Sequence, residues 1–258
     1  MRLAERIGYN EGDISMRFEC AQITDVGSRS INEDSIGVFE NKGNNCFVVC
    51  DGLGGHGMGD VASSLAVEVF KSQFYKSDDV ETFLSSAFSA AQDILLTEQK
   101  ARNARRKMKT TAVSVVTDKK YAYIGHVGDS RAYVFSHNKV KKRTLDHSIP
   151  QMLVIAGDIK ESEIRHHPER NTVLKVIGVE WEEPQYELMR TFPLRKCQAF
   201  LLCTDGFWEL IEEEEMCALL KDSENVSEWL SRMADIVRKN GKDNNADNFS
   251  AIAVWCVR

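Results

Sequence analysis

Proline is scarce in this chain, and long hydrophobic runs are missing altogether. Only 4 of the 258 residues are proline, and no low-complexity linker divides the sequence. No run approaches the roughly 18 consecutive apolar residues of a membrane-spanning helix. The first fifteen residues also lack the apolar stretch that a secretory signal peptide requires. We therefore expect a cytoplasmic protein with no membrane partner.

Paired cysteines are missing as well. The seven cysteines are an odd number, and no two of them form a CxxC pair. Several lie in apolar runs such as FVVC, FLLC and VWCV, where cysteine acts as a small buried hydrophobe. A chain of this size does not depend on a disulfide framework, so we expect reduced thiols. The histidines and cysteines do not show the spacing of a zinc site either.

Basic charge is not in excess. Lysine and arginine number 33 against 39 aspartates and glutamates, which gives a formal net charge of −6. Phosphate backbones demand a basic surface, so this balance argues against a dedicated nucleic-acid binder. The 43% hydrophobic and 28% charged shares are those of an ordinary globular protein, long enough to bury a core.

The hydrophobic pattern predicts strands and helices in separate blocks. The segment 147–179 is polar and irregular, which is typical of a mobile insert over a site. We expect helices from an N-cap at Asp60 through Phe70, and over about 80–104, 212–221 and 226–240. Apolar runs predict strands at 16–24, 35–40, 46–50, 111–116, 121–127, 131–136, 198–203 and 249–257. This order indicates an α+β layered domain and not a doubly wound α/β sheet.

Acidic residues stand at the ends of the predicted strands. Asp51 follows CFVVC, Asp205 follows FLLCT, and Asp247 precedes FSAIAV, while Glu33 and Asp34 occupy a polar turn. Such residues also occur in turns for purely structural reasons. If all five converge, they cannot stay ionised side by side without a cation. Hard oxygen ligands in this number suit Mg²⁺ or Mn²⁺.

Eight motifs occur along the sequence: GSRSINED (27–34), VVCDGLGGHGMGDVAS (48–63), KTTAV (109–113), GHVGDSRAY (125–133), LDHS (145–148), HHPERNTVLKVIG (166–178), LLCTDGFWE (201–209) and ADNFSAIAV (246–254). In the same order, they resemble those of the metal-dependent protein phosphatases (type 2C protein serine/threonine phosphatases), bacterial branch. The resemblance implies a four-layer α-β-β-α sandwich, in which helix pairs flank a central antiparallel β-sandwich. It also implies a single catalytic domain over residues 1–258 with a flap insert at about 148–175.

The resemblance implies a binuclear centre of Mn²⁺ or Mg²⁺. Asp51 resembles the carboxylate that bridges the two ions, and the carbonyl of Gly52 completes the shell of one of them. Glu33 resembles the acid that holds this first ion through water. Asp205 and Asp247 resemble the ligands of the second ion.

A third ion is also implied, together with a reaction. Asp129 in GDSR resembles a ligand of a weaker third site, although this segment is equally compatible with a simple tight turn. Arg29 resembles the arginine that grips the substrate phosphate, for which a planar guanidinium is suited. The implied reaction is hydrolysis of phosphoserine and phosphothreonine in proteins by a metal-bridging hydroxide, which attacks phosphorus in line. The implied partners are phosphoproteins and a bacterial Ser/Thr kinase, with the phosphatase acting as a monomer.

Three positions depart from the family pattern or leave its chemistry open. Leu53 stands where the animal branch has a histidine proposed as general acid, and leucine has no proton to donate. His56 could replace it, although a turn-stabilising role is the plainer interpretation. Glu209 stands where relatives often have aspartate, near the implied third site.

Two other functions fit parts of the sequence. One is a catalytically weak phosphoprotein-binding regulatory module of the same fold, which we would expect to have lost metal ligands. The other is a different two-metal hydrolase, such as a phosphodiesterase or a nuclease. The negative net charge and the lack of a basic groove count against a nucleic-acid substrate.

Overall fold

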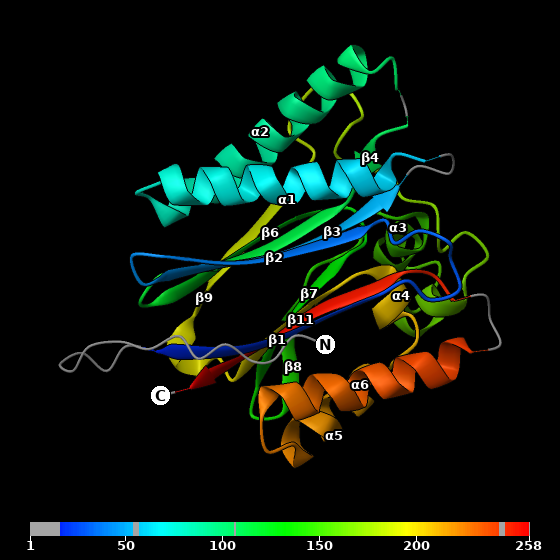
Figure 1. Ribbon diagram of the computed structural model, residues 1–258. Coiled ribbons are helices and arrows are strands. Elements are labelled where there is room, and N and C mark those ends of the chain that lie inside the picture. The colour runs from blue at the N-terminus through cyan, green and yellow to red at the C-terminus, as the bar shows by residue number, and fades with distance from the viewer. Residues whose placement is uncertain (1–15, 54–56, 106, 243–245, 258) are drawn as a thin grey trace.

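Two antiparallel sheets lie face to face, and helices cover the outer face of each, as Figure 1 shows. The computed structural model describes residues 16–53, 57–105, 107–242 and 246–257. The layers follow the order α-β-β-α, so the predicted α+β four-layer sandwich is confirmed. Within the described residues, no helix combines the length and the apolar character that crossing a membrane requires.

The first sheet joins the two ends of the described chain. Its last strand, β11 (Phe249–Val257), lies inside the sheet and pairs with β1 (Arg17–Asp25) on one side and with β10 (Ala199–Cys203) on the other. The strand order is β1 (Arg17–Asp25), β11 (Phe249–Val257), β10 (Ala199–Cys203), β7 (Arg131–Ser136) and β8 (Lys139–Arg143).

The second sheet is built from consecutive hairpins and one distant strand. A short strand, β4 (Lys109–Thr110), pairs with the end of β3 (Asn44–Leu53). The strand order is β2 (Asp34–Asn41), β3 (Asn44–Leu53), β5 (Ala112–Thr117), β6 (Tyr121–Val127) and β9 (Glu187–Pro193).

Helix pairs cover the two outer faces. The first pair packs on the second sheet, and the second pair packs on the first sheet (Figure 1). Shorter helices flank the ends of the strands. The pairs are α1 (Gly59–Lys76) with α2 (Val80–Ala101), and α5 (Glu213–Asp222) with α6 (Val226–Gly241); the shorter helices are α3 (Ile149–Ala156), η1 (Glu161–His166), η2 (Leu194–Lys196) and α4 (Asp205–Trp208).

Strand β5 shows why the central strands read as nearly continuous apolar runs. All six of its residues are buried. Val113 and Val115 face the hydrophobic layer between the two sheets, whereas Ala112 and Val116 face the layer beneath α1 and α2. Side chains alternate between the faces of a strand, so a strand covered on both faces must be apolar at nearly every position.

Several predicted element boundaries are wrong. Helix α1 begins at Gly59 with Met58 as its N-cap, so Asp60 lies inside the first turn and does not cap the helix. Helix α2 ends at Ala101 and not near residue 104. The segment 147–179 contains α3 and η1, and α3 has a regular N-cap at Ser148. The prediction that cysteines in the apolar runs act as buried hydrophobes is confirmed for Cys46, Cys50 and Cys203, which are all buried.

Candidate metal centre and phosphate site

The predicted acids come from both sheets to one end of the sandwich. Asp34 opens β2 and pairs with Asp51 of β3, in the second sheet. Asp205 follows β10, and Asp247 precedes β11, in the first sheet. A cavity of about 370 Å³ opens between them. Its lining includes Arg29, Glu33, Asp51, Gly52, Asp129, Asp205 and Asp247, which are all the residues predicted for the site.

Close backbone contacts fix Glu33 against Gly52. The amide of Gly52 donates to the carbonyl of Glu33 over 3.1 Å. A Cβ atom at position 52 would lie 2.5 Å from that carbonyl oxygen and would also overlap the carbonyl oxygen of Gly59. Only glycine fits this approach, so the glycine after Asp51 is required by packing as well as by its place in the motif.

Asn248 organises the loop that carries Glu33 and Arg29. Its Oδ1 accepts from the amide of Glu33 over 2.8 Å. Its Nδ2 donates to the carbonyls of Val26 and Ile31 over 2.9 and 3.0 Å. Sequence reasoning missed this residue, although the ADN motif beside Asp247 was the signal that could have found it.

The electrostatics of the cluster are those of an acidic centre. Burial, followed by the negative charges of Asp205 and Asp34, raises the pKa of Asp51 well above its usual range. Burial and the charge of Asp205 do the same to the pKa of Asp129. Burial raises the pKa of Asp34 to about 7, and the pKa of Asp205 is also raised, by burial and then by Asp247. Each shift favours the protonated carboxyl, and a bound cation would offset it by favouring the ionised form.

One oxygen atom of Asp34 indicates whether these residues fit a metal ion. Oδ1 of Asp34 is buried and has no hydrogen-bond partner among the described residues. The other oxygen, Oδ2, accepts from the hydroxyl of Thr204 over 3.1 Å. A bare buried carboxylate oxygen beside several other acids is costly for a protein without a cation. The donor set therefore fits hard divalent cations.

Arg29 lies at the rim of the cavity. Its Nη2 donates to Oδ2 of Asp247 over 2.8 Å, and the two side chains are 49% and 47% exposed. The amide of Arg29 donates to the carbonyl of Val26, which closes the turn that carries this side chain. A guanidinium at this rim can receive a phosphate.

Asp129 is buried in the turn between β6 and β7, where the side chain of Trp208 binds its backbone carbonyl. The indole Nε1 of Trp208 donates to the carbonyl of Asp129 over 3.0 Å. The guanidinium of Arg131 lies 3.3 Å above the centre of the indole ring and forms two hydrogen bonds with Asp146, of 2.8 and 2.6 Å. Sequence reasoning missed Trp208 and Asp146, whose contacts connect distant parts of the chain.

The remaining candidates lie around the cavity or away from it. Leu53 lines the cavity at the end of β3. Glu209 lines a neighbouring cavity of about 490 Å³, where its Oε2 lies 3.1 Å from Nε of Arg170; burial, and then Asp205, raise its pKa to about 7. His56 lies outside the described residues. His126 and His147 are buried in a separate cluster.

The fold and the acid-lined cavity define a known class of enzyme. The family described as protein phosphatase 2C matches residues 25–249, and the chain belongs to this family. It is therefore a protein phosphatase, as the sequence motifs predict.

Individual relatives agree with this assignment. A curated relative, the serine/threonine phosphatase stp of Listeria welshimeri, is 33% identical over 242 residues, which cover 90% of this chain and 93% of that protein. The solved structure of the serine/threonine phosphatase Stp1 from Staphylococcus aureus is similar with a TM-score of 0.83 and 27% identity, over 98% of this chain and 100% of that one. The catalytic domain of PstP, solved with 2 manganese ions, is similar in fold with a TM-score of 0.79 and 23% identity, over 95% of this chain and 100% of that one.

Proposed function

We propose that the chain hydrolyses phosphoserine and phosphothreonine in proteins, and that the acid-lined cavity is its active site. The observation that carries the proposal is the meeting of acids from both sheets at one cavity with Arg29 at its rim. The substrate class is supported by the names of the Listeria and Staphylococcus relatives. A catalytically weak binding module is not favoured, because Asp51, Asp205 and Asp247 are all present.

The acids are proposed to hold two ions of Mn²⁺ or Mg²⁺, as the two manganese ions in the structure of PstP support. Asp51 would serve both ions, Gly52 and Glu33 would hold the first, and Asp205 and Asp247 would hold the second. Asp129 is proposed for a third site. When bound, such cations neutralise the acids and lower the pKa of coordinated water.

The chain's own residues then orient the substrate. Arg29 can offer two N–H donors to the phosphoryl oxygens, which positions phosphorus over the acids. Leu53 has no ionisable proton, so the proton for the departing serine or threonine oxygen comes from another source. The segment 148–175 contributes Arg165, Arg170 and Asn171 to the neighbouring cavity and is proposed as a flap that affects substrate choice.

The domain organisation, oligomeric state, partners and location of the chain are also proposed. We expect the chain to form one catalytic domain over residues 1–258 and to act as a monomer. A bacterial Ser/Thr kinase and its targets are the proposed partners. A cytoplasmic location is proposed because the cysteines lie in apolar runs and form no CxxC pair, which is typical of thiols that stay reduced.

Hydrolysis of a phosphothreonine peptide tests the proposal. We expect turnover with Mn²⁺, loss of turnover with a chelator, and a loss of at least about 100-fold in Asp205→Asn, since one carboxylate ligand becomes a neutral amide. The matched control is Asp235→Asn, in which the same exchange is made on an exposed part of α6. Its activity should equal that of the wild type.

Two results would contradict the mechanism. One is turnover that persists in the chelator, and the other is an Asp205→Asn variant as active as the control. Absence of turnover with retained binding of the phosphopeptide would instead support the binding module.

A further inference from the structure

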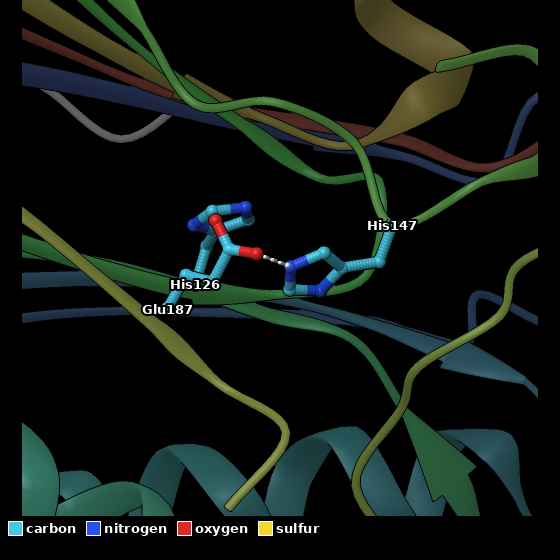
Figure 2. A group of neighbouring side chains, drawn as sticks. All are labelled: His126, His147 and Glu187. Atoms are coloured by element: carbon cyan, nitrogen blue, oxygen red, sulfur yellow. Dashed lines mark ion pairs between the residues drawn. The ribbon is translucent and has the colours of Figure 1, made fainter. Parts of the chain in front are cut away.

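A second cluster of potential ligands lies outside the acid-lined cavity. His126 of β6, His147 before α3 and Glu187 of β9 face one another, as Figure 2 shows. The imidazole rings stack with centroids 4.7 Å apart, and the ligand atoms of the three residues lie within 4.8 Å of one another. Both histidines are buried, whereas the side chain of Glu187 is 53% exposed and opens the cluster to solvent.

The hydrogen bonds of His126 prepare one of its nitrogens to bind an ion. Its Nε2 lies 2.7 Å from the carbonyl oxygen of Leu145, which can only accept, so Nε2 carries the proton. Nδ1 therefore presents a lone pair, and it is buried without a hydrogen-bond partner among the described residues. Histidines that bind metals typically donate their other N–H to a carbonyl or carboxylate in this way.

In the free protein, His147 carries its proton on the ring nitrogen that faces Glu187. Its Nδ1 accepts from the amide of Gly128 over 3.2 Å, which leaves the proton on Nε2. Nε2 lies 3.1 Å from Oε1 of Glu187 and points toward it, as Figure 2 shows. Burial lowers the pKa of both histidines, that of His147 to about 4, so both are in the neutral form that binds metals near pH 7.

We propose that Nδ1 of His126, Nε2 of His147 and the carboxylate of Glu187 form a site for a transition-metal ion of the zinc type, with water as a fourth ligand. Two imidazoles favour such ions over Mg²⁺ and Mn²⁺. Bonds of about 2 Å to zinc put ligand atoms about 3.3 Å apart, so the ion draws the three groups inward. It also displaces Lys175, whose Nζ lies 3.8 Å from Oε1 of Glu187.

A metal ion at this site would break one hydrogen bond of the free protein, the one from the amide of Gly128 to Nδ1 of His147. To bind through Nε2, His147 must carry its proton on Nδ1, which then no longer accepts from the amide of Gly128. Gly128 precedes Asp129, and the carbonyl of His147 also accepts from the amide of Leu174 over 2.7 Å. The ion therefore loosens the turn that carries Asp129, and amide exchange at Gly128 becomes faster.

Titration with Zn²⁺ of the full chain, kept saturated with Mg²⁺, tests the site by calorimetry. Mg²⁺ occupies the acid-lined cavity and competes poorly for imidazole. We expect one zinc equivalent to bind, with affinity at least tenfold lower in His126→Ala and in Glu187→Gln. The matched control is His137→Asn, which removes an exposed imidazole at a left-handed position that asparagine tolerates, and it should bind like the wild type.

Cobalt identifies the ligands. Co²⁺ bound at this site should give d–d absorption without a thiolate charge-transfer band, which separates it from binding at the partly exposed Cys217 and Cys256. Glu187 is at the surface, so the zinc affinity of Glu187→Gln tests the proposed site even if the histidine variants fail to fold. Wild-type protein that binds no zinc in excess Mg²⁺, or a Glu187→Gln variant that binds as tightly as the control, would overturn the proposal.

Discussion

Nη2 of Arg29 donates a hydrogen bond to Oδ2 of Asp247 over 2.8 Å, although the two residues are 218 positions apart in the chain. The proposed phosphate-binding residue is therefore held by a proposed metal ligand. A carboxylate that shares its charge with a cation attracts a guanidinium less strongly. Metal binding would thus release Arg29 toward the phosphate, and the contact would couple the two steps.

Replacing Arg29 by alanine should impair substrate binding and leave metal binding intact. Hydrogen bonds to charged groups contribute about 1.5–3 kcal/mol, so kcat/KM for a phosphopeptide should fall by about 10- to 100-fold, mainly through KM. Steady-state kinetics at saturating Mn²⁺ measure this fall, and calorimetry measures the affinity for Mn²⁺. Arg29→Lys should recover part of the loss, since it keeps the charge without the planar fork. Loss of Mn²⁺ binding would show that Arg29 has a different role.

Without metal, the ionisation of Asp34 should lower the stability of the protein as the pH rises. Burial raises the pKa of Asp34 from 3.8 to about 7 in the folded protein, so the folded state binds a proton that the unfolded state has released. The stability that this proton provides is fully present below 3.8 and is lost as the pH rises through about 7. Thermal unfolding in chelator across this range measures the loss.

Asp34→Asn tests the source of this dependence. The amide cannot ionise, so the loss of stability in chelator should be smaller, whereas Asp235→Asn on the surface should behave like the wild type. Saturating Mn²⁺ should raise the melting temperature most at the higher pH, where the acids are free to bind it. An Asp34→Asn variant whose stability in chelator changes with pH just as that of the wild type does would contradict the assignment of Asp34.

His147 should produce the opposite dependence. Burial, and then His126, lower its pKa from 6.5 to about 4, so the unfolded state binds the proton first as the pH falls. The stabilising contribution is present above 6.5 and is lost as the pH falls through about 4, with a span of about 3 kcal/mol. The difference in unfolding free energy between the wild type and His147→Gln should therefore narrow over this interval. A difference that is constant with pH would show that His147 does not titrate as its burial requires.

The parts of the fold that the sequence predicts are those that local pattern encodes. The central strands are apolar because both of their faces are covered. Their ends can therefore be located in the sequence, and the acids lie at those ends. Strands β8 and β9 escaped prediction because they lie at sheet edges, where charged and exposed residues such as those of KVKKR protect against further pairing.

The supports of the candidate site escaped prediction for a different reason. Asn248 reaches the loop at 26–33, and Trp208 reaches Asp129, 79 positions away in the chain. Such contacts exist only after the two sheets have packed together. The acids can therefore be found from strand ends and motif order, whereas the groups that position them require the structure.

Gly52→Ala should disrupt the metal centre through the backbone alone. The added Cβ would lie 2.5 Å from the carbonyl oxygen of Glu33, so Gly52 or Glu33 must shift, at a cost of about 1–3 kcal/mol. Thermal unfolding measures this cost, and calorimetry should show weaker Mn²⁺ binding, because the carbonyl of Gly52 and the carboxylate of Glu33 move apart from Asp51. Gly43→Asn is the control, since position 43 lies in an open turn with φ of +80° that asparagine tolerates. If Gly52→Ala binds Mn²⁺ as tightly as this control, neither the carbonyl of Gly52 nor Glu33 serves the first ion.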